Sequence, residues 1–330
     1  NGVCETASGN GICTLRAAIQ EANALTSCTP FTINFNVALP GTITLGSDLP
    51  TIAHPNLTIT GPGADQLTVD GASLYRPFSI GSGNYAVTLS GLKVANGRAN
   101  GGAGLINFST GQVNLNNMAF DSNSITGSSG GGGVRHGSSG TINITGSTFT
   151  NNNSTGAGGG GINNFSTNGT VNVTNCTFTG NLANIGGGIH NQSSGTINIT
   201  NCTLVSNSGG INNNSGTATV KNTIAVGNGT DLSGTVTASN NLTGTLASAL
   251  LSALGSYGGT TQTFALLPGS PAINAGTSSG APATDQRGVA RPQQSGVDIG
   301  AFESRGFTLA INVLARYLVR RVRQRSGLSA

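Results

Sequence analysis

Short segments in which apolar residues alternate with Thr or Asn recur along the middle of the chain. Five of them align with one another: residues 113–117, 142–146, 171–175, 197–201 and 218–222, which read VNLNN, INITG, VNVTN, INITN and ATVKN. They begin 29, 29, 26 and 21 residues apart. Alternation with a period of two residues predicts β-strands rather than helices.

Each of these segments opens a repeat that has the same further parts. A second alternating segment follows it, at residues 118–123, 147–152, 176–181 and 202–207. A run of Gly then ends in one aliphatic residue, at Val134, Ile162, Ile189 and Ile211. Between these parts, the stretch around residues 125–129 varies in length from repeat to repeat, which predicts an edge that carries loops.

A repeat of this length cannot bury its apolar residues alone, whereas stacked repeats bury them in one continuous core. Gly and Asn tolerate positive φ and therefore suit the corners between strands. We predict an all-β fold, a right-handed parallel β-helix, over residues 31–245. With less regular strands at 42–45, 57–60, 67–70 and 87–90, the expected count is about ten turns.

The N-terminal end breaks this pattern. Residues 1–30 are expected to form a cap, because a solenoid needs a cover over its first open turn. Its helix, 14–25, begins at the N-cap residue Thr14. One apolar face is formed by Leu15, Ala18, Ile19, Ala22 and Leu25.

The C-terminal end differs as well. Residues 246–303 are expected to form a second cap, with a short helix at 247–254. Opposite charges gather there in an otherwise uncharged chain, at Asp285, Arg287, Arg291, Asp298 and Glu303. A catalytic cluster is one interpretation, but a salt-bridged cap that seals the last turn is favoured, since the open end has unpaired backbone groups to cover.

Residues 304–330 read as an apolar strand followed by an Arg-rich tail. The apolar positions of the strand are Phe307, Leu309, Ile311 and Val313. Such a strand suits addition to the sheet edge of a neighbouring subunit. The tail also admits binding to an acidic surface, or no selected role at all, and strand exchange and an idle end are equally compatible with the sequence.

Composition narrows the function classes. Gly supplies 53 of the 330 residues and only 7% are charged, which argues against a charged helical bundle. No apolar window is long enough to predict a transmembrane helix. Six of the 14 basic residues are Arg in 304–330, where there is no acid, so the net charge of +4 comes from the tail. The body has no basic surface, and no nucleic-acid partner is expected.

The five Cys fall into two groups. Cys4, Cys13 and Cys28 lie in the polar N-terminal segment, where a disulfide between two of them is expected. Cys176 and Cys202 occupy the same position in successive repeats, so stacked buried thiols are favoured over a disulfide. No spacing fits a zinc site, and no metal or other cofactor is expected.

Several motifs resemble those of one group of secreted bacterial proteins. Residues 13–19 (CTLRAAI) resemble the Cys-Ser-Leu-Arg-Glu-Ala motif at the mature N-terminus of many secreted β-helix proteins, although Thr and Ala replace its Ser and Glu. Residues 61–71 (GPGADQLTVDG) are typical of the same group. The segments LPGSPAINAG, DQRGVARP and VDIGAFE, within residues 267–303, resemble the choice-of-anchor Q domain. The paired Phe-x-x-Asn and Gly-Gly-x-Ile elements are similar to the repeats of polymorphic outer-membrane-protein adhesins.

This resemblance implies a right-handed β-helix that is secreted or displayed on a surface, and it implies no established activity. We therefore expect an extracellular or cell-surface location, with a signal peptide removed before Asn1. In the family an anchor or further domains often follow the VDIGAFE element, whereas here the Arg-rich tail follows it.

Few residues of the wall could carry catalysis. From Val87 to Gly244 the acids are Asp121 and Asp231, which lie several turns apart and cannot form the carboxylate pair of a hydrolase. Alignment of the Gly runs places Arg135, Asn163 and His190 in one column and His136, Asn164 and Asn191 in the next. A base with an electrophile is conceivable in the first column, but a polar structural corner is favoured. The catalytic candidates are therefore Asp121, Arg135 and His190, and catalysis is not expected.

Asn recurs at equivalent positions in two columns, Asn123, Asn152, Asn181 and Asn207 in one and Asn143, Asn172 and Asn198 in the other. Stacking in register lets side-chain amides form hydrogen-bonded ladders, as in cross-β structures. The structural role is favoured, and sugar binding is an alternative where a column faces solvent. Thr-Phe-Thr occurs in only two adjacent repeats, too few for an ice-binding array.

Two functions remain. The first is an extracellular structural or adhesive protein that self-associates head to tail into filaments through its ends and its C-terminal strand, with cell-surface glycans as further candidate partners. The second is a carbohydrate-active enzyme, lyase or hydrolase, or a carbohydrate-binding module, which rests on fold analogy.

Overall fold

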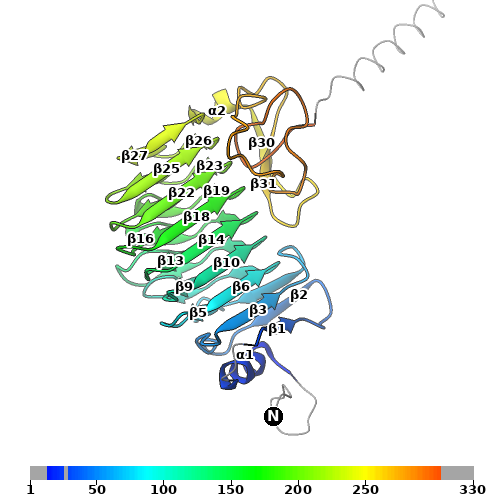
Figure 1. Cartoon of the computed structure of the whole chain (residues 1–330), viewed down its shortest axis with the longest axis vertical. Coiled ribbons are helices and arrows are strands. Elements are labelled where there is room, and N and C mark those ends of the chain that lie inside the picture. Colours follow the sequence, from blue (N-terminus) through cyan, green and yellow to red (C-terminus); the bar gives the residue numbers. More distant parts are fainter. Residues whose placement is uncertain (1–12, 26–28, 306–330) are drawn as a thin grey trace, which may run out of the picture.

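The computed structural model describes residues 13–25 and 29–305 and is an elongated parallel β-helix with residues 250–305, the C-terminal segment, beside it (Figure 1). Sheet A has nine parallel strands, β1 (Phe31–Asn34), β3 (Asn56–Thr60), β6 (Ala86–Ser90), β10 (Gln112–Asn116), β14 (Thr141–Thr145), β18 (Thr170–Thr174), β22 (Thr196–Thr200), β25 (Thr217–Lys221) and β28 (Thr237–Ser239). Sheet B also has nine, β2 (Gly41–Thr44), β4 (Leu67–Asp70), β7 (Lys93–Ala95), β11 (Ala119–Asp121), β15 (Thr148–Thr150), β19 (Thr177–Thr179), β23 (Thr203–Val205), β26 (Ile224–Val226) and β29 (Leu242–Gly244).

Two further sheets complete the wall. Sheet C has seven strands, β5 (Phe78–Ile80), β9 (Leu105–Asn107), β13 (Val134–His136), β17 (Ile162–Asn164), β21 (Ile189–Asn191), β24 (Ile211–Asn213) and β27 (Leu232–Gly234). Sheet D has four, β8 (Arg98–Ala99), β12 (Ser124–Ile125), β16 (Asn153–Gly158) and β20 (Leu182–Ile185). The predicted parallel β-helix is confirmed, but the count of about ten turns is too high. The edge that we expected to carry loops is partly ordered as sheet D.

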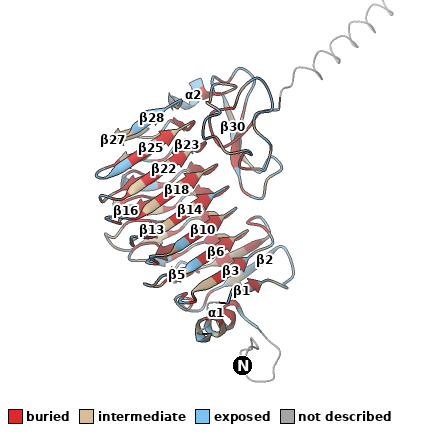
Figure 2. Cartoon of the chain, in the orientation of Figure 1, coloured by how far each residue is buried: buried red, intermediate tan, exposed pale blue. Residues whose placement is uncertain are grey.

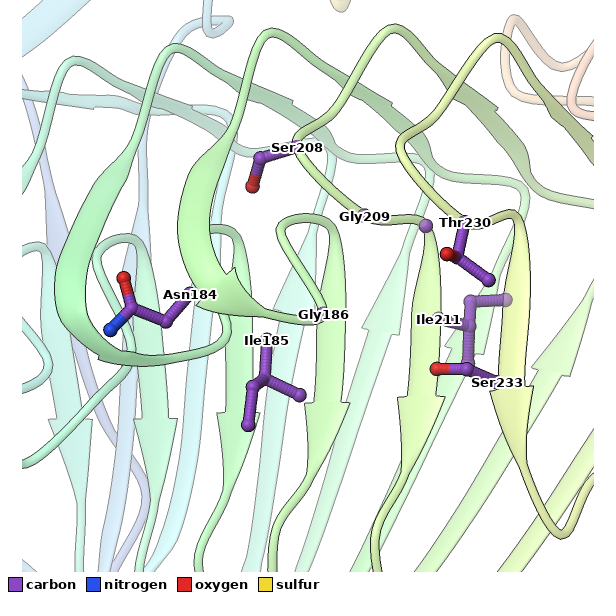
Figure 3. A pocket seen from close by; sticks show the side chains of 9 residues that line it. Asn184, Ile185, Gly186, Ser208, Gly209, Ile211, Thr230 and Ser233 are labelled. Carbon is purple, nitrogen blue, oxygen red and sulfur yellow. The ribbon is translucent and has the colours of Figure 1, made fainter.

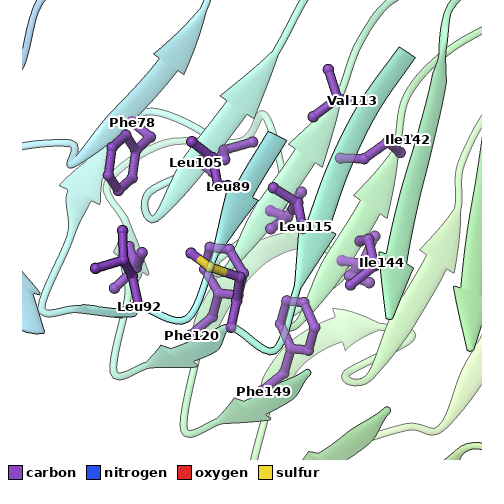
Figure 4. Close-up of a cluster of buried hydrophobic side chains, with 14 of the residues drawn as sticks. Phe78, Leu89, Leu92, Leu105, Val113, Leu115, Phe120, Ile142, Ile144 and Phe149 are labelled. Atoms are coloured by element: carbon purple, nitrogen blue, oxygen red, sulfur yellow. The ribbon is translucent and has the colours of Figure 1, made fainter. Parts of the chain in front are cut away.

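The register that the repeats predict is confirmed. Val113 pairs with Ile142, Ile142 with Val171, and Val171 with Ile197. Because side chains alternate between the two faces of a strand, this register stacks like residues in columns inside the β-helix. Figure 4 shows part of the resulting core, with aliphatic side chains from sheets A and C, the ring of Phe78 from sheet C and the rings of Phe120 and Phe149 from sheet B.

Three aromatic rings form the most regular column of the core. Phe120, Phe149 and Phe178 lie on successive strands of sheet B and are each fully buried. The centroid of the Phe149 ring is 4.9 Å from that of Phe120 and 4.6 Å from that of Phe178, with interplanar angles of 11° and 6°. The Gly runs make room for the rings, since a Cβ on Gly133 would lie 3.0 Å from Cδ1 of Phe149.

A buried Asn ladder runs along the corner that follows sheet B. The Nδ2 atoms of Asn123, Asn152 and Asn181 each donate to the Oδ1 atom of the Asn one turn further on, at 2.9, 2.9 and 2.8 Å. Each Oδ1 atom also accepts from the backbone N–H of the preceding Asn, at 3.0–3.1 Å. The predicted ladder is confirmed, and it continues from Asn207 through Asn228 to Asp231, whose Oδ1 atom accepts from Asn228.

The second predicted ladder lies on the outer surface of sheet A. Asn143 donates to Asn114, Asn172 to Asn143 and Asn198 to Asn172, at 2.8–2.9 Å between Nδ2 and Oδ1. These side chains are half-buried. Since their amides bond to one another along the column, the ladder is part of the wall.

The corners and the buried thiols also follow the repeat. Between sheets A and B, Asn117 and Asn175 have φ values of 52° and 51°, and Gly146 takes the equivalent place. Asn tolerates this left-handed conformation better than most residues.

The thiols of Cys176 and Cys202 are buried and free, as predicted. Burial, together with the neighbouring thiol, raises the pKa of Cys176. Cys13 is disulfide-bonded, and its partner lies outside the described residues.

The N-terminal helix forms as predicted. Helix α1 (Leu15–Ala24) begins after Thr14, whose side chain accepts a hydrogen bond from the backbone N–H of Ala17 at 3.2 Å. Leu15, Ala18, Ile19 and Ala22 are buried and belong to the main core. The helix therefore lies against the first turn (Figure 1).

The second predicted helix is wrong for most of its length. Helix α2 (Leu246–Ala249) has four residues and ends at Leu250, which has a φ of 50°. The chain then forms strand β30 (Leu251–Gly255), which pairs antiparallel with β31 (Thr263–Leu266). Apolar spacing alone did not distinguish a short helix from a short strand here.

The charged C-terminal cluster is salt-bridged as predicted. Arg287 pairs with Asp285, and Nη1 of Arg291 lies 2.7 Å from Oε2 of Glu303. Asp298 is fully buried, and its Oδ2 atom accepts from the backbone and the hydroxyl of Ser304, both at 2.6 Å. This network holds the C-terminal segment together.

The cluster does not seal the last turn, so the predicted position is wrong. The C-terminal segment lies along the outer surface of sheet B, where Thr203 accepts from the backbone N–H of Ala301 and Asn201 donates to the backbone of Asp298. Apolar side chains of β23 and β26 are buried beneath it in a second core, with Phe264, Ile299 and Phe302. The same segment covers Thr148 and Thr177, which removes them from any outer Thr array.

The strands of the last turn are largely exposed in the described structure. All three residues of β28 are exposed (Figure 2), and β28, β27 and β29 each end their sheet. The two ends of the described β-helix are therefore unlike, one covered by α1 and the other presenting sheet edges. The predicted assembly residues Phe307, Leu309, Ile311 and Val313 lie outside the described residues.

Candidate functional site

A cleft lies between the outer surface of sheet B and the C-terminal segment. Its volume is about 510 Å³. Sheet B contributes Thr68, Lys93, Ala119, Asp121, Thr148 and Thr150 to its lining, and the C-terminal segment contributes Leu254, Ser256, Thr260, Thr261 and Gln262.

One ion pair occupies the wall of this cleft. Nζ of Lys93 lies 2.8 Å from Oδ2 of Asp121, and the hydroxyl of Thr150 donates to Oδ1 of Asp121 at 2.7 Å. Burial acts to raise the pKa of Asp121, but the hydrogen bonds from Lys93 and Thr150 and the Lys93 charge outweigh it, so the pKa lies below its ordinary value. Asp121 is thus an ionised carboxylate near neutral pH and unsuited to donating a proton.

The cleft brings in one acid that the sequence analysis did not select. Asp65 lies at the same cleft, and its Oδ2 atom accepts from Nε2 of Gln66 at 3.0 Å. It lies in the loop before β4, ahead of the regular repeats, so its place at this cleft was not visible in the spacing. Two carboxylates in one cleft are the arrangement most compatible with chemistry on a sugar.

A smaller pocket of about 150 Å³ lies near the last turns, where sheet D gives way to sheet C (Figure 3). Asn184, Ser208, Thr230 and Ser233 give it a polar lining. It holds no charged or titratable side chain, so it offers hydrogen bonds but no acid, base or nucleophile activated by a neighbour.

The predicted column of Arg135, Asn163 and His190 is confirmed. Arg135 pairs with Asn163 and Asn163 with His190 on neighbouring strands of sheet C. Their side chains are on its outer surface, whereas Asp121 lies on sheet B. The three catalytic candidates therefore do not form one site.

His190 is buried in this column without a hydrogen-bond partner for either ring nitrogen in the described structure. Burial lowers its pKa to about 4, so the ring is neutral at physiological pH. No described carboxylate orients the ring, and a base in an acid–base mechanism normally needs such positioning. His190 is a polar element of the outer surface rather than a positioned base.

His136 belongs to the inner column of sheet C, with Asn107 and Asn164 on either side. Its Nε2–H donates to the carbonyl of Gly140 at 3.1 Å, and its Nδ1 atom, 3.0 Å from Nδ2 of Asn107, accepts from that amide. Burial lowers its pKa to about 4 despite the hydrogen bond to Gly140.

We expect His136→Asn to reduce the acid sensitivity of the fold. Between pH 6.5 and about 4 the unfolded chain binds a proton at His136 and the folded chain does not, so stability is lost as the pH falls through this window. The variant should lose about 2 kcal/mol less than the wild type between pH 7 and pH 5. Urea denaturation at the two pH values measures this difference, and equal losses in both proteins would contradict it. Asn suits the site because its column neighbours Asn107 and Asn164 are Asn.

Comparison of the chain with protein-family models, with curated proteins and with solved structures gave no significant match. Among residues 13–25 and 29–305, no group of His, Cys, Asp and Glu is arranged to hold a metal ion. Within the same ranges, no helix has the length and hydrophobicity needed to span a bilayer.

Proposed function

We propose that the chain is an extracellular structural or adhesive β-solenoid that assembles into filaments. The observation that carries the proposal is that two acidic residues of the β-helix wall are bound to structural partners. Asp121 is paired with Lys93, and Asp231 terminates the buried Asn ladder by accepting from Asn228. Carboxylates committed to structural partners suit a scaffold better than a catalytic wall.

The unlike ends of the β-helix support head-to-tail contact. The exposed edge of β28 carries backbone groups that can pair with another strand. The alternating apolar residues 307–313 of a second copy are the occupant that we propose for this edge. A contact between two different surfaces repeats from copy to copy and gives a filament where its rotation does not close into a ring. The resemblance of residues 13–19 and 267–303 to secreted β-helix proteins supports an extracellular site of assembly.

Deletion of residues 306–330 is expected to abolish assembly. The full chain should form oligomers or filaments in light scattering and electron microscopy, and the deletion variant should be monomeric. A matched variant that lacks only residues 314–330 keeps the apolar strand and loses the Arg residues, so it should still assemble. A full chain that stays monomeric at high concentration would rule the filament out.

One observation favours the alternative, a carbohydrate-active enzyme. Asp65 and Asp121 line the same cleft, together with Lys93. Incubation with polyuronides and neutral glycans, followed by analysis of released sugars, separates the two functions. Cleavage by the wild type that is lost in Asp121→Asn would establish the enzyme, because that substitution removes the charge but keeps the shape.

A further inference from the structure

Two exposed Phe side chains lie in one row on the outer surface of sheet C. The backbone N–H groups of Phe108, Gly137 and Phe165 donate to the carbonyls of residues 80, 107 and 136 on the preceding turns, which places the three residues in register. Phe108 is 36% exposed and Phe165 is 42% exposed, although most large apolar side chains of the described β-helix are buried. Gly137 separates them, and the ring of Phe108 lies over it, since a Cβ on Gly137 would be 2.9 Å from Cε1 of Phe108.

The guanidinium group of Arg135 lies over this row. Its Cζ atom is 4.6 Å from the ring centroid of Phe165 and 6.0 Å from that of Phe108. Stacking on aromatic rings holds an Arg side chain in place while leaving its N–H groups available in the plane of the group. We refer to Phe108, Arg135 and Phe165 as the Arg–Phe clamp.

Arg135 has no counter-charge among the described residues. It makes no ion pair there, and its Nε atom is buried without a hydrogen-bond partner. Burial lowers its pKa, and the charge of Arg76 nearby lowers it further. By contrast, Lys93, Arg287 and Arg291 each have a carboxylate partner. A half-buried cation without a partner is costly, and such a residue is more readily explained by a ligand that supplies the negative charge.

The column that contains Arg135 has unused hydrogen-bonding capacity. Asn163, one turn beyond Arg135, is fully buried, and its Oδ1 atom accepts no hydrogen bond in the described structure. The Oδ1 atom of Asn212 and both ring nitrogens of His190 are in the same situation. Aromatic surfaces beside a few polar groups that lack partners are typical of small-molecule and sugar sites.

We propose that the Arg–Phe clamp binds an anionic glycan, with Arg135 on a sugar carboxylate or sulfate and the Phe rings against the sugar ring. The guanidinium fork matches the two oxygens of a carboxylate or sulfate. The C–H face of a pyranose is apolar and suits the exposed rings of Phe108 and Phe165. The inference rests on the adhesive role proposed above and names its ligand class.

Binding is measured with the full chain at 0.15 M salt, by isothermal titration calorimetry. The probes are an oligogalacturonate, which carries carboxylates, a sulfated dextran, and neutral dextran as the uncharged control. The Arg-rich tail is present in every protein compared, so its contribution cancels. We expect binding to one or both anionic probes and none to neutral dextran, and the two anionic probes tell carboxylate from sulfate.

Arg135→Gln should weaken binding about tenfold or more, because it removes a charge-assisted contact. Phe165→Ala should weaken it about fivefold. Arg98→Gln is the matched control, since it removes the same charge from an exposed position on sheet D, and it should change the affinity by less than about twofold. Equal losses for Arg135→Gln and Arg98→Gln would mean general charge attraction and would overturn the clamp, as would the absence of binding by the wild type.

The assembly assay keeps this result separate from the proposed function. Arg135→Gln should still form filaments, because it lies far in sequence and structure from the open edge of β28. Filaments without glycan binding would overturn only the clamp. Glycan binding through Arg135 by a chain that stays monomeric would overturn only the filament.

Discussion

Phe149→Ala is expected to lower the free energy of unfolding by about 3–5 kcal/mol. Phe149 is the middle ring of the buried stack, so its loss removes both ring contacts and leaves a cavity between Phe120 and Phe178. The backbone on either side is held in ladders by the neighbouring turns, and this limits collapse into the cavity. Urea denaturation followed by circular dichroism measures the effect.

Phe149→Leu is the matched control for this experiment. Leu204 occupies the same column two turns further on, so the wall accepts a Leu at this place. The expected loss is about 1–2 kcal/mol. If Phe149→Ala costs no more than Phe149→Leu, the aromatic stack is not a major source of stability.

Arg291→Met is expected to cost about 3–5 kcal/mol, because it leaves Glu303 charged and buried without its partner. It also removes the donors to the backbone carbonyls of Asp298 and Gly300. Burial raises the pKa of Glu303 even with Arg291 present. Hydrogen exchange should show the effect first in residues 250–305, because the ion pair lies within the C-terminal segment.

A double-mutant cycle separates the charge from the packing. Glu303→Gln removes the charge and keeps one of the two carboxylate oxygens, which can accept from the backbone N–H of Gln293 or of Asp298 but not from both, because these bond to different oxygens. In combination with Arg291→Met it should recover part of the loss, since no unpaired charge then stays buried. Additive losses would show that the ion pair is not coupled and that the segment is held mainly by its apolar contacts.

The repeats made the body of the fold predictable. Residues such as Val113 and Ile142, or Asn152 and Asn181, recur at spacings that can only be satisfied together if successive turns stack in register. Arg135 and His190 were placed in one column by the same reasoning. The repeats within this one sequence show which residues lie next to one another, information that otherwise comes from comparing related sequences.

Where repetition ends, prediction from the sequence was weaker. Nothing in the spacing of Asp285, Arg291 and Glu303 indicated that they would lie along sheet B instead of across the last turn. Their position depends on apolar surfaces such as Val205 and Ile224, which the repeat pattern assigns to the wall without showing what covers them. The cleft between sheet B and the C-terminal segment, and the role of Asp65 in it, were invisible for the same reason. The Arg–Phe clamp was missed because its two Phe residues differ from the repeat.

Because equivalent residues of successive turns stack on one another, the length of the molecule is modular. Val113 pairs with Ile142 and Ile142 with Val171, so excision of residues 142–170 would bring Val113 opposite Val171. Phe120 would then lie next to Phe178, and Asn123 next to Asn181. The ring stacking and the amide hydrogen bonds would therefore be re-formed with residues of the same type. A gene can therefore lengthen or shorten this rod by whole coils through unequal recombination, without the redesign that a conventional core would demand.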